Sequence, residues 1–124
     1  MNVVDSSGWL AYFADEPQAK HFNKPLTDPA ALIVPTVSIY EVFKVVLRES
    51  SENEALQAVA AMQKGKVIDL TPSLAMTASK LSLTHKLPMV DSIILATARE
   101  YEAILWTLDS DFKNVKGVKY YSKK

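Results

Sequence analysis

The chain has 124 residues, of which 48% are apolar and 23% are charged, and this balance excludes a disordered or fibrous protein. It contains no cysteine, which excludes disulfide bonds and thiolate metal sites, and its 14 basic and 14 acidic residues exclude nucleic-acid binding by bulk positive charge alone. The length predicts one domain over residues 1–124, and the lack of cysteine favours a cytoplasmic location. We expect no contact with a membrane, because no segment approaches the roughly 20 apolar residues that cross a bilayer.

Predicted strands and helices alternate along the chain. In order they are a strand at 3–4, a helix at 9–13, a short helix within 15–29, a strand at 32–34, a long helix after Pro35, a helix at 53–63, a strand at 67–70, a helix at 72–85, a helix from Pro88, and strands at 104–107 and 118–121. This alternation predicts a parallel sheet with helices on both faces, the three-layer α/β/α architecture.

Three helices predict which side chains are buried. In the helix after Pro35, we expect Glu41 to face away from the core, because it shares a polar stripe with Lys44 and Arg48. In the helix at 53–63, the expected apolar side is formed by Leu56, Val59 and Met62. The helix from Pro88 is apolar on nearly every side at residues 93–96, so we expect it to be buried although its first turn carries an acid.

Four acidic residues map to one edge of the predicted sheet: Asp5, Glu41, Asp91 and Asp109. Asp5 and Asp109 follow strands, whereas Glu41 and Asp91 lie near the starts of helices. In a parallel sheet, the carboxyl ends of the strands and the starts of the returning helices share one edge, so we expect these acids to converge. Two carboxylates about 5 Å apart repel by roughly 3 kcal/mol at an effective dielectric near 20, so such a cluster indicates a bound cation.

Each acid also has an ordinary structural interpretation. Asp5 fits a helix N-cap, Asp91 fits the positive end of a helix dipole, and Asp109 fits an Asx-turn. The stretch from Ser38 to Glu41 fits a capping box. Each of these interpretations is as good as a metal site for one acid alone, but capping does not require all four acids to share one edge.

Four ordered motifs resemble the acidic motifs of PIN-domain nucleases: VVDSSGWLAYF, SIYEV, LPMVDSIILATA and TLDSDF. They match in order and spacing across essentially the whole chain, and PIN domains of this length resemble the VapC-type toxins of toxin–antitoxin pairs. The resemblance implies a five-stranded parallel sheet in the order 3-2-1-4-5 and Mg²⁺- or Mn²⁺-dependent cleavage of RNA that leaves 5′-phosphate and 3′-hydroxyl ends. Ser92 is one departure, since many relatives have alanine there, and it adds a hydroxyl near the expected site.

The chemistry of magnesium predicts a role for each site residue. Mg²⁺ binds oxygen ligands at about 2.0–2.1 Å, and we expect Asp5 and Asp91 to bind it directly. Glu41 and Asp109 are expected to orient water or to hold a second ion, and Asp111 is left open between metal ligand and turn residue. The hydroxyls of Ser6 and Thr107 are expected to hold these carboxylates in place.

Other side chains are candidates for RNA contact. Lys44 and Arg48 share the stripe of Glu41 and are candidates for phosphate contacts, although a solvated helix face explains them nearly as well. Three aromatic side chains are candidates for base stacking, with packing in the core or under a partner as the favoured alternative: Trp9, Tyr12 and Phe13.

The predicted partners are an RNA substrate, a cognate antitoxin and a second copy of the chain, as the resemblance implies. The helices at 9–13 and 53–63 carry apolar residues that so small a domain does not fully cover, and an extended antitoxin segment would bury that groove and block the acidic edge. Two alternatives stay open at this point: another metal-dependent phosphohydrolase, and a non-catalytic module that binds RNA or protein.

Overall fold

The computed structural model describes residues 1–123 and contains one parallel sheet of five strands in the order β3-β2-β1-β4-β5. The strands are β1 (Asn2–Val4), β2 (Leu32–Pro35), β3 (Lys66–Ile68), β4 (Ile104–Thr107) and β5 (Val118–Tyr120). The α-helices are α1 (Ser6–Phe13), α2 (Asn23–Leu26), α3 (Thr36–Glu49), α4 (Glu52–Met62), α5 (Pro72–His85) and α6 (Met89–Glu100), and the 3₁₀ helices are η1 (Pro17–Phe22), η2 (Pro29–Ala31) and η3 (Ser110–Phe112). The predicted architecture and strand order are confirmed.

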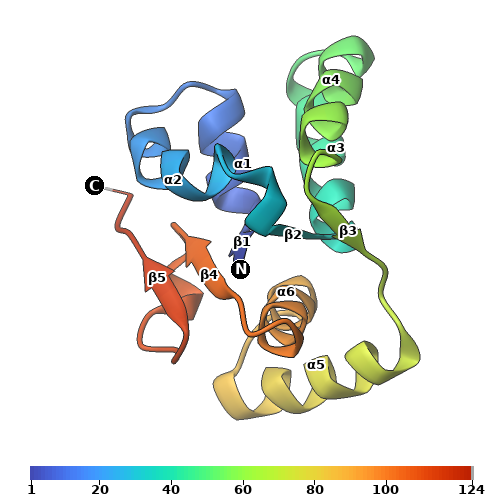
Figure 1. Ribbon diagram of the computed structural model, residues 1–124, viewed down its shortest axis with the longest axis vertical. Helices are drawn as coiled ribbons and strands as arrows, with labels where there is room; N and C mark the ends of the chain where they lie inside the picture. The colour runs from blue at the N-terminus through green and yellow to red at the C-terminus, as the bar shows by residue number, and fades with distance from the viewer. Residues whose placement is uncertain (124) are drawn as a thin grey trace.

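The sheet is covered by helices on both faces, because successive strand residues point to opposite sides. Val4 and Trp106 belong to the core cluster formed with α1, α3 and α4. Val3 and Leu105 belong to a second cluster, formed with α6. Figure 1 shows α5 and α6 on one side of the sheet and α1, α3 and α4 on the other. Burial on both faces explains why the strands read as continuous apolar runs.

The buried side of α4 differs from the prediction. Met62 is buried as predicted, and Ala55 and Ala58 are buried with it, whereas Leu56, which was expected on the apolar side, is 56% exposed. This helix packs against α3, and alanine side chains at the contact allow the two helix axes to approach closely. The larger leucine therefore points outward.

Helix α6 is buried from Ser92 to Ala98, as predicted. No helix in the described part of the chain is long and apolar enough to cross a bilayer.

A close contact between α1 and β1 sets the position of the first turn of α1. A Cβ atom on Gly8 would lie 2.7 Å from Val4 Cγ1 and 2.8 Å from Phe22 Cε1, so a larger residue would push the helix away from the strand. Gly8 thereby keeps Ser6 and Ser7 close to the carboxyl end of β1. This placement matters because both serines contact carboxylates of the candidate site.

Candidate metal centre

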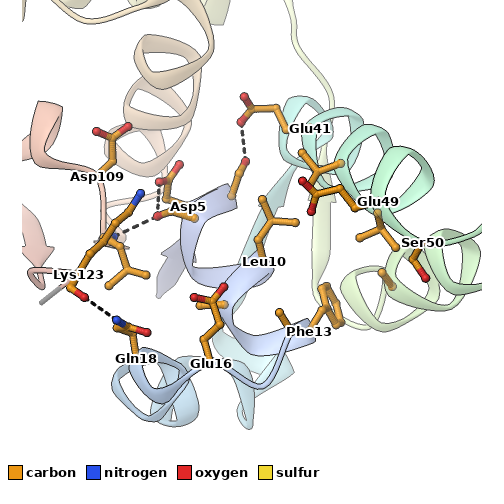
Figure 2. A pocket seen from close by; sticks show the side chains of 18 of the residues that line it. Asp5, Leu10, Phe13, Glu16, Gln18, Glu41, Glu49, Ser50, Asp109 and Lys123 are labelled. Carbon is orange, nitrogen blue, oxygen red and sulfur yellow. Dashed lines mark hydrogen bonds between the residues drawn. The ribbon is translucent and has the colours of Figure 1, made fainter.

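The four predicted acids converge at the carboxyl edge of the sheet. Asp5, Glu41, Asp91 and Asp109 line one pocket with a volume of about 1070 Å³. Asp5 follows β1, Glu41 lies in the second turn of α3, Asp91 lies in the first turn of α6, and Asp109 follows β4. Figure 2 shows Asp5, Glu41 and Asp109 around one end of this pocket.

Asp5 is buried and held by two hydroxyl groups. It is 3% exposed, and its Oδ2 accepts hydrogen bonds from Ser7 Oγ and Thr107 Oγ1, each at 2.8 Å. The same hydroxyls accept hydrogen bonds from the loop after β4. Thr107 Oγ1 accepts from the amide of Asp109 at 2.9 Å, and Ser7 Oγ accepts from the amide of Leu108 at 3.0 Å. Asp5 occupies the N-cap position of α1, as its structural interpretation predicted, but its side chain makes no capping hydrogen bond, so capping does not account for the carboxylate.

Glu41 is held by Ser6 and does not form a capping box. Ser6 Oγ donates to Glu41 Oε1 at 2.6 Å, so this hydroxyl contacts one of the four acids, and its role in a metal site stays a prediction. Helix α3 begins at Thr36, so Ser38 lies inside the helix, where it is fully buried and its hydroxyl has no hydrogen-bond partner among the described residues. Glu41 does lie off the apolar stripe, but it faces α1 and the pocket.

Three carboxylates lie close enough to share one cation. One oxygen from each of Asp91, Asp109 and Asp111 lies within 4.8 Å of the other two. Asp109 Oδ1 also accepts from the amide of Asp111 at 2.9 Å, so the Asx-turn interpretation of Asp109 is correct as well. That turn brings Asp111, which is exposed, to the cluster. Asp5 is not part of this closest group, and its role as a direct ligand stays a prediction.

Burial and mutual repulsion perturb the carboxyl groups. The pKa of Asp91 is raised from 3.8 to about 8, chiefly by burial and next by the negative charges of Asp5 and Asp109. Burial also raises the pKa of Asp5, and the hydrogen bonds from Ser7 and Thr107 oppose that rise. A divalent cation would relieve this repulsion, and a set of carboxylate oxygens without histidine or thiolate fits a hard cation such as Mg²⁺ or Mn²⁺.

The family model of the PIN domain matches residues 3–118. The chain belongs to the PIN-domain family. Comparison with curated proteins gives no match.

Solved structures share the fold of this PIN domain. It is similar to a toxin–antitoxin complex from Klebsiella pneumoniae, with a TM-score of 0.83, 22% identity, and coverage of 98% of this chain and 99% of that chain. It is similar to VapC20 from Mycobacterium tuberculosis, a toxin that cleaves the sarcin–ricin loop, with a TM-score of 0.78, 20% identity, and coverage of 94% and 95%. A DNA-bound VapBC from Salmonella typhimurium gives a TM-score of 0.73, 14% identity, and coverage of 98% of each chain.

The pocket of this PIN domain continues beyond the acids, between α1 and the pair α3 and α4. Its apolar lining in this part is formed by Leu10, Phe13, Val45, Val46 and Ala58. Further acidic side chains line it at Glu16, Glu49 and Glu54. The pocket therefore has two parts, one suited to a cation and one that combines apolar walls with negative charge.

The other predicted contact residues lie mostly outside this pocket. Lys44 Nζ sits 5.6 Å from the ring centroid of Tyr40, and Arg48 forms an exposed ion pair with Glu49 at 3.3 Å. Neither basic side chain lines the pocket. Trp9 is 3% exposed and belongs to the core, so base stacking by this residue is excluded, as the core alternative predicted.

Ser7 and Lys123 were not predicted from the sequence, and the hydroxyl of Ser92 makes a contact within its own helix. Ser7 follows Asp5 by two residues in the first turn of α1, and only the pairing of β1 with β4 shows that it reaches both Asp5 and Leu108. Lys123 lies beyond the last strand, where no sequence pattern places it. Ser92 was expected to add a hydroxyl near the site, but its Oγ donates to the carbonyl of Met89 at 2.7 Å within α6.

Proposed function

We propose that this PIN domain is a Mg²⁺- or Mn²⁺-dependent endoribonuclease and the toxin of a toxin–antitoxin pair. The observation that carries the proposal is the group of three carboxylates from Asp91, Asp109 and Asp111, placed within 4.8 Å of one another beside the buried Asp5. Membership of the PIN family and the likeness to a toxin that cleaves the sarcin–ricin loop support it.

In this mechanism Asp91, Asp109 and Asp111 would hold the cation, and Asp5, at the end of β1, would contribute its carboxylate to the same pocket. When bound, the cation supplies an activated water and neutralises charge on the phosphate. Ser7 and Thr107 keep Asp5 in one orientation by donating to the same oxygen. These contacts connect β1 to the loop after β4, so the carboxylates on the two strands keep a fixed separation.

In the proposed reaction a carboxylate accepts the proton of the attacking water. No histidine in the described part of the chain lines the pocket, whereas Glu41 lines it and keeps one oxygen free of the bond that Ser6 donates to Oε1. We assign Glu41 to orient the attacking water and accept its proton. This assignment explains why the Ser6 contact matters, because it sets the direction of the free oxygen.

The partner we propose is an antitoxin segment that fills the second part of the pocket. Leu10, Phe13 and Val45 favour apolar side chains there, and the acids Glu16 and Glu49 favour basic ones. The same acids repel RNA phosphates, so this part of the pocket suits a protein better than the substrate. The expected homodimer stays a prediction, which light scattering of the purified chain tests.

Cleavage of RNA with and without a divalent cation tests the proposed function. We expect the protein to cut RNA in the presence of Mg²⁺ or Mn²⁺, and a chelator to abolish the cut. Asp91→Asn should lower the rate by about 100-fold or more, because it removes one of three clustered carboxylates. The control is Asp28→Asn, which removes the same charge at an exposed position that does not line the pocket.

The outcome of this test also separates the alternatives. Cleavage that survives both the chelator and Asp91→Asn would contradict the proposal. Hydrolysis of small phosphate esters without RNA cleavage would indicate a phosphohydrolase. RNA or protein binding without any hydrolysis would indicate a non-catalytic PIN module.

A further inference from the structure

Residues 121–123, which follow β5, are anchored beside the pocket, and Lys123 is one of its lining residues. The amide of Tyr121 donates to the carbonyl of Thr107 at 2.9 Å, and its ring stacks on His21 with 4.2 Å between the ring centroids. The carbonyl of Lys123 accepts from Gln18 Nε2 at 2.5 Å, a contact drawn in Figure 2. Two hydrogen bonds therefore hold this segment, one from Tyr121 to β4 and one from Gln18 of η1 to Lys123.

Among residues 1–123, Lys123 supplies the one basic side chain that lines the pocket. Seven carboxyl residues line it as well: Asp5, Glu16, Glu41, Glu49, Glu54, Asp91 and Asp109. Figure 2 shows the Lys123 side chain extending toward the end of the pocket where Asp5 and Asp109 lie. Within residues 1–123 the one ion pair at 4.0 Å or less joins Arg48 and Glu49, so the Lys123 ammonium is not paired with any of these carboxylates.

We propose that Lys123 binds a non-bridging phosphate oxygen of the RNA strand and so positions that strand at the candidate metal centre, an inference that rests on the proposed function. A pocket with seven carboxylates repels a polyanion unless a positive charge faces the backbone where it enters. An ammonium group is a compact charge that suits phosphate oxygens, and Lys123 offers one that no carboxylate neutralises by direct contact.

Three variants test this role by steady-state cleavage of a short single-stranded RNA. Lys123→Gln should raise KM about tenfold and reduce the steepness of the salt dependence of kcat/KM by about 0.7, the slope of one phosphate contact on a single strand. Lys123→Arg keeps the charge and should retain most of the wild-type KM. Lys80→Gln, which removes an exposed lysine of α5 outside the pocket, should leave both values unchanged.

A binding measurement tests the contact between Lys123 and RNA without requiring cleavage. In an Asp91→Asn background, fluorescence anisotropy of a labelled RNA should show about tenfold weaker binding after Lys123→Gln. With Asp91 intact, titration with Mn²⁺ should show no loss of metal affinity after Lys123→Gln. Equal RNA affinity with either residue at this position, or an arginine variant as weak as the glutamine variant, would overturn the inference. If the wild-type protein cuts no RNA, the proposed function fails, and the binding comparison still decides the role of Lys123.

Discussion

Asp5 and Asp91 are both site carboxylates with raised pKa values, yet the fold holds them in opposite ways. Asp5 receives two hydroxyl hydrogen bonds that favour its charged form, from Ser7 and Thr107. At Asp91, burial and then the charges of Asp5 and Asp109 disfavour the charged form and raise the pKa to about 8. The protein therefore fixes one carboxylate with its own donors and leaves the other to be neutralised by a proton or a cation. The state of Asp91 should therefore set much of the pH dependence of cation binding at this site, beside that of Asp5, whose pKa burial also raises.

The pH dependence of metal binding is the most sensitive test of this contrast. Below its pKa of about 8, Asp91 must lose a proton before it binds a cation, so affinity should rise as the pH rises and level off above that value. One displaced proton gives up to about a tenfold gain per pH unit, or about 100-fold between roughly pH 6 and pH 8. Calorimetric titration with Mn²⁺ at a series of pH values measures this gain.

The Asp91→Asn variant is the matched comparison for the pH series. It should bind Mn²⁺ more weakly at pH 8 and should lose most of the pH dependence, because its amide does not titrate. Asp28→Asn should reproduce the wild-type curve, since the exposed Asp28 does not line the pocket. Affinity that is constant from about pH 6 to pH 8 in the wild-type protein would contradict the account of Asp91.

The contacts that fix Asp5 can be removed without changing any charge. Thr107→Val deletes the hydroxyl that donates to Asp5 Oδ2 and accepts from the amide of Asp109, and we expect RNA cleavage to fall about 10- to 100-fold. Thr97→Val is the control, because Thr97 is a buried threonine of α6 whose hydroxyl bonds to the carbonyl of Ile93. Both variants should lose similar stability, on the order of 1 kcal/mol, in chemical denaturation. Equal activity of the two variants would show that the orientation of Asp5 is not limiting.

The edge position of the acids could be predicted from the sequence, because it depends only on the order of elements. Asp5 and Asp109 follow strands, and Asp91 begins a helix that returns to β4, so any parallel α/β arrangement brings them together. The strand order itself came from the family resemblance, because alternation alone does not rank the neighbours of β1. The predicted hydroxyls of Ser6 and Thr107 do contact carboxylates of the site.

The features that were missed depend on contacts between residues far apart in the chain. The partners of Ser7 follow from the register of β1 against β4, and Lys123 is placed by Gln18. Periodicity also failed to identify the buried side of α4. The rule that large apolar side chains are buried favours Leu56, whereas close packing of α4 on α3 selects Ala55 and Ala58.

The stability of the metal-free protein provides the mildest test of the contrast between Asp5 and Asp91. The folded-state pKa of Asp91 lies above its ordinary value of 3.8, so the folded protein holds an extra proton between about pH 4 and pH 8. Stability should therefore fall as the pH rises through this range, because the unfolded chain releases that proton more easily. Asp91→Asn should reduce this fall and raise the melting temperature at pH 8 by a few degrees in the presence of a chelator. With saturating Mg²⁺ the order should reverse, because the wild-type site gains binding energy that the variant loses. A variant that melts below the wild type in both conditions would show that Asp91 stabilises the fold by some contact other than cation binding.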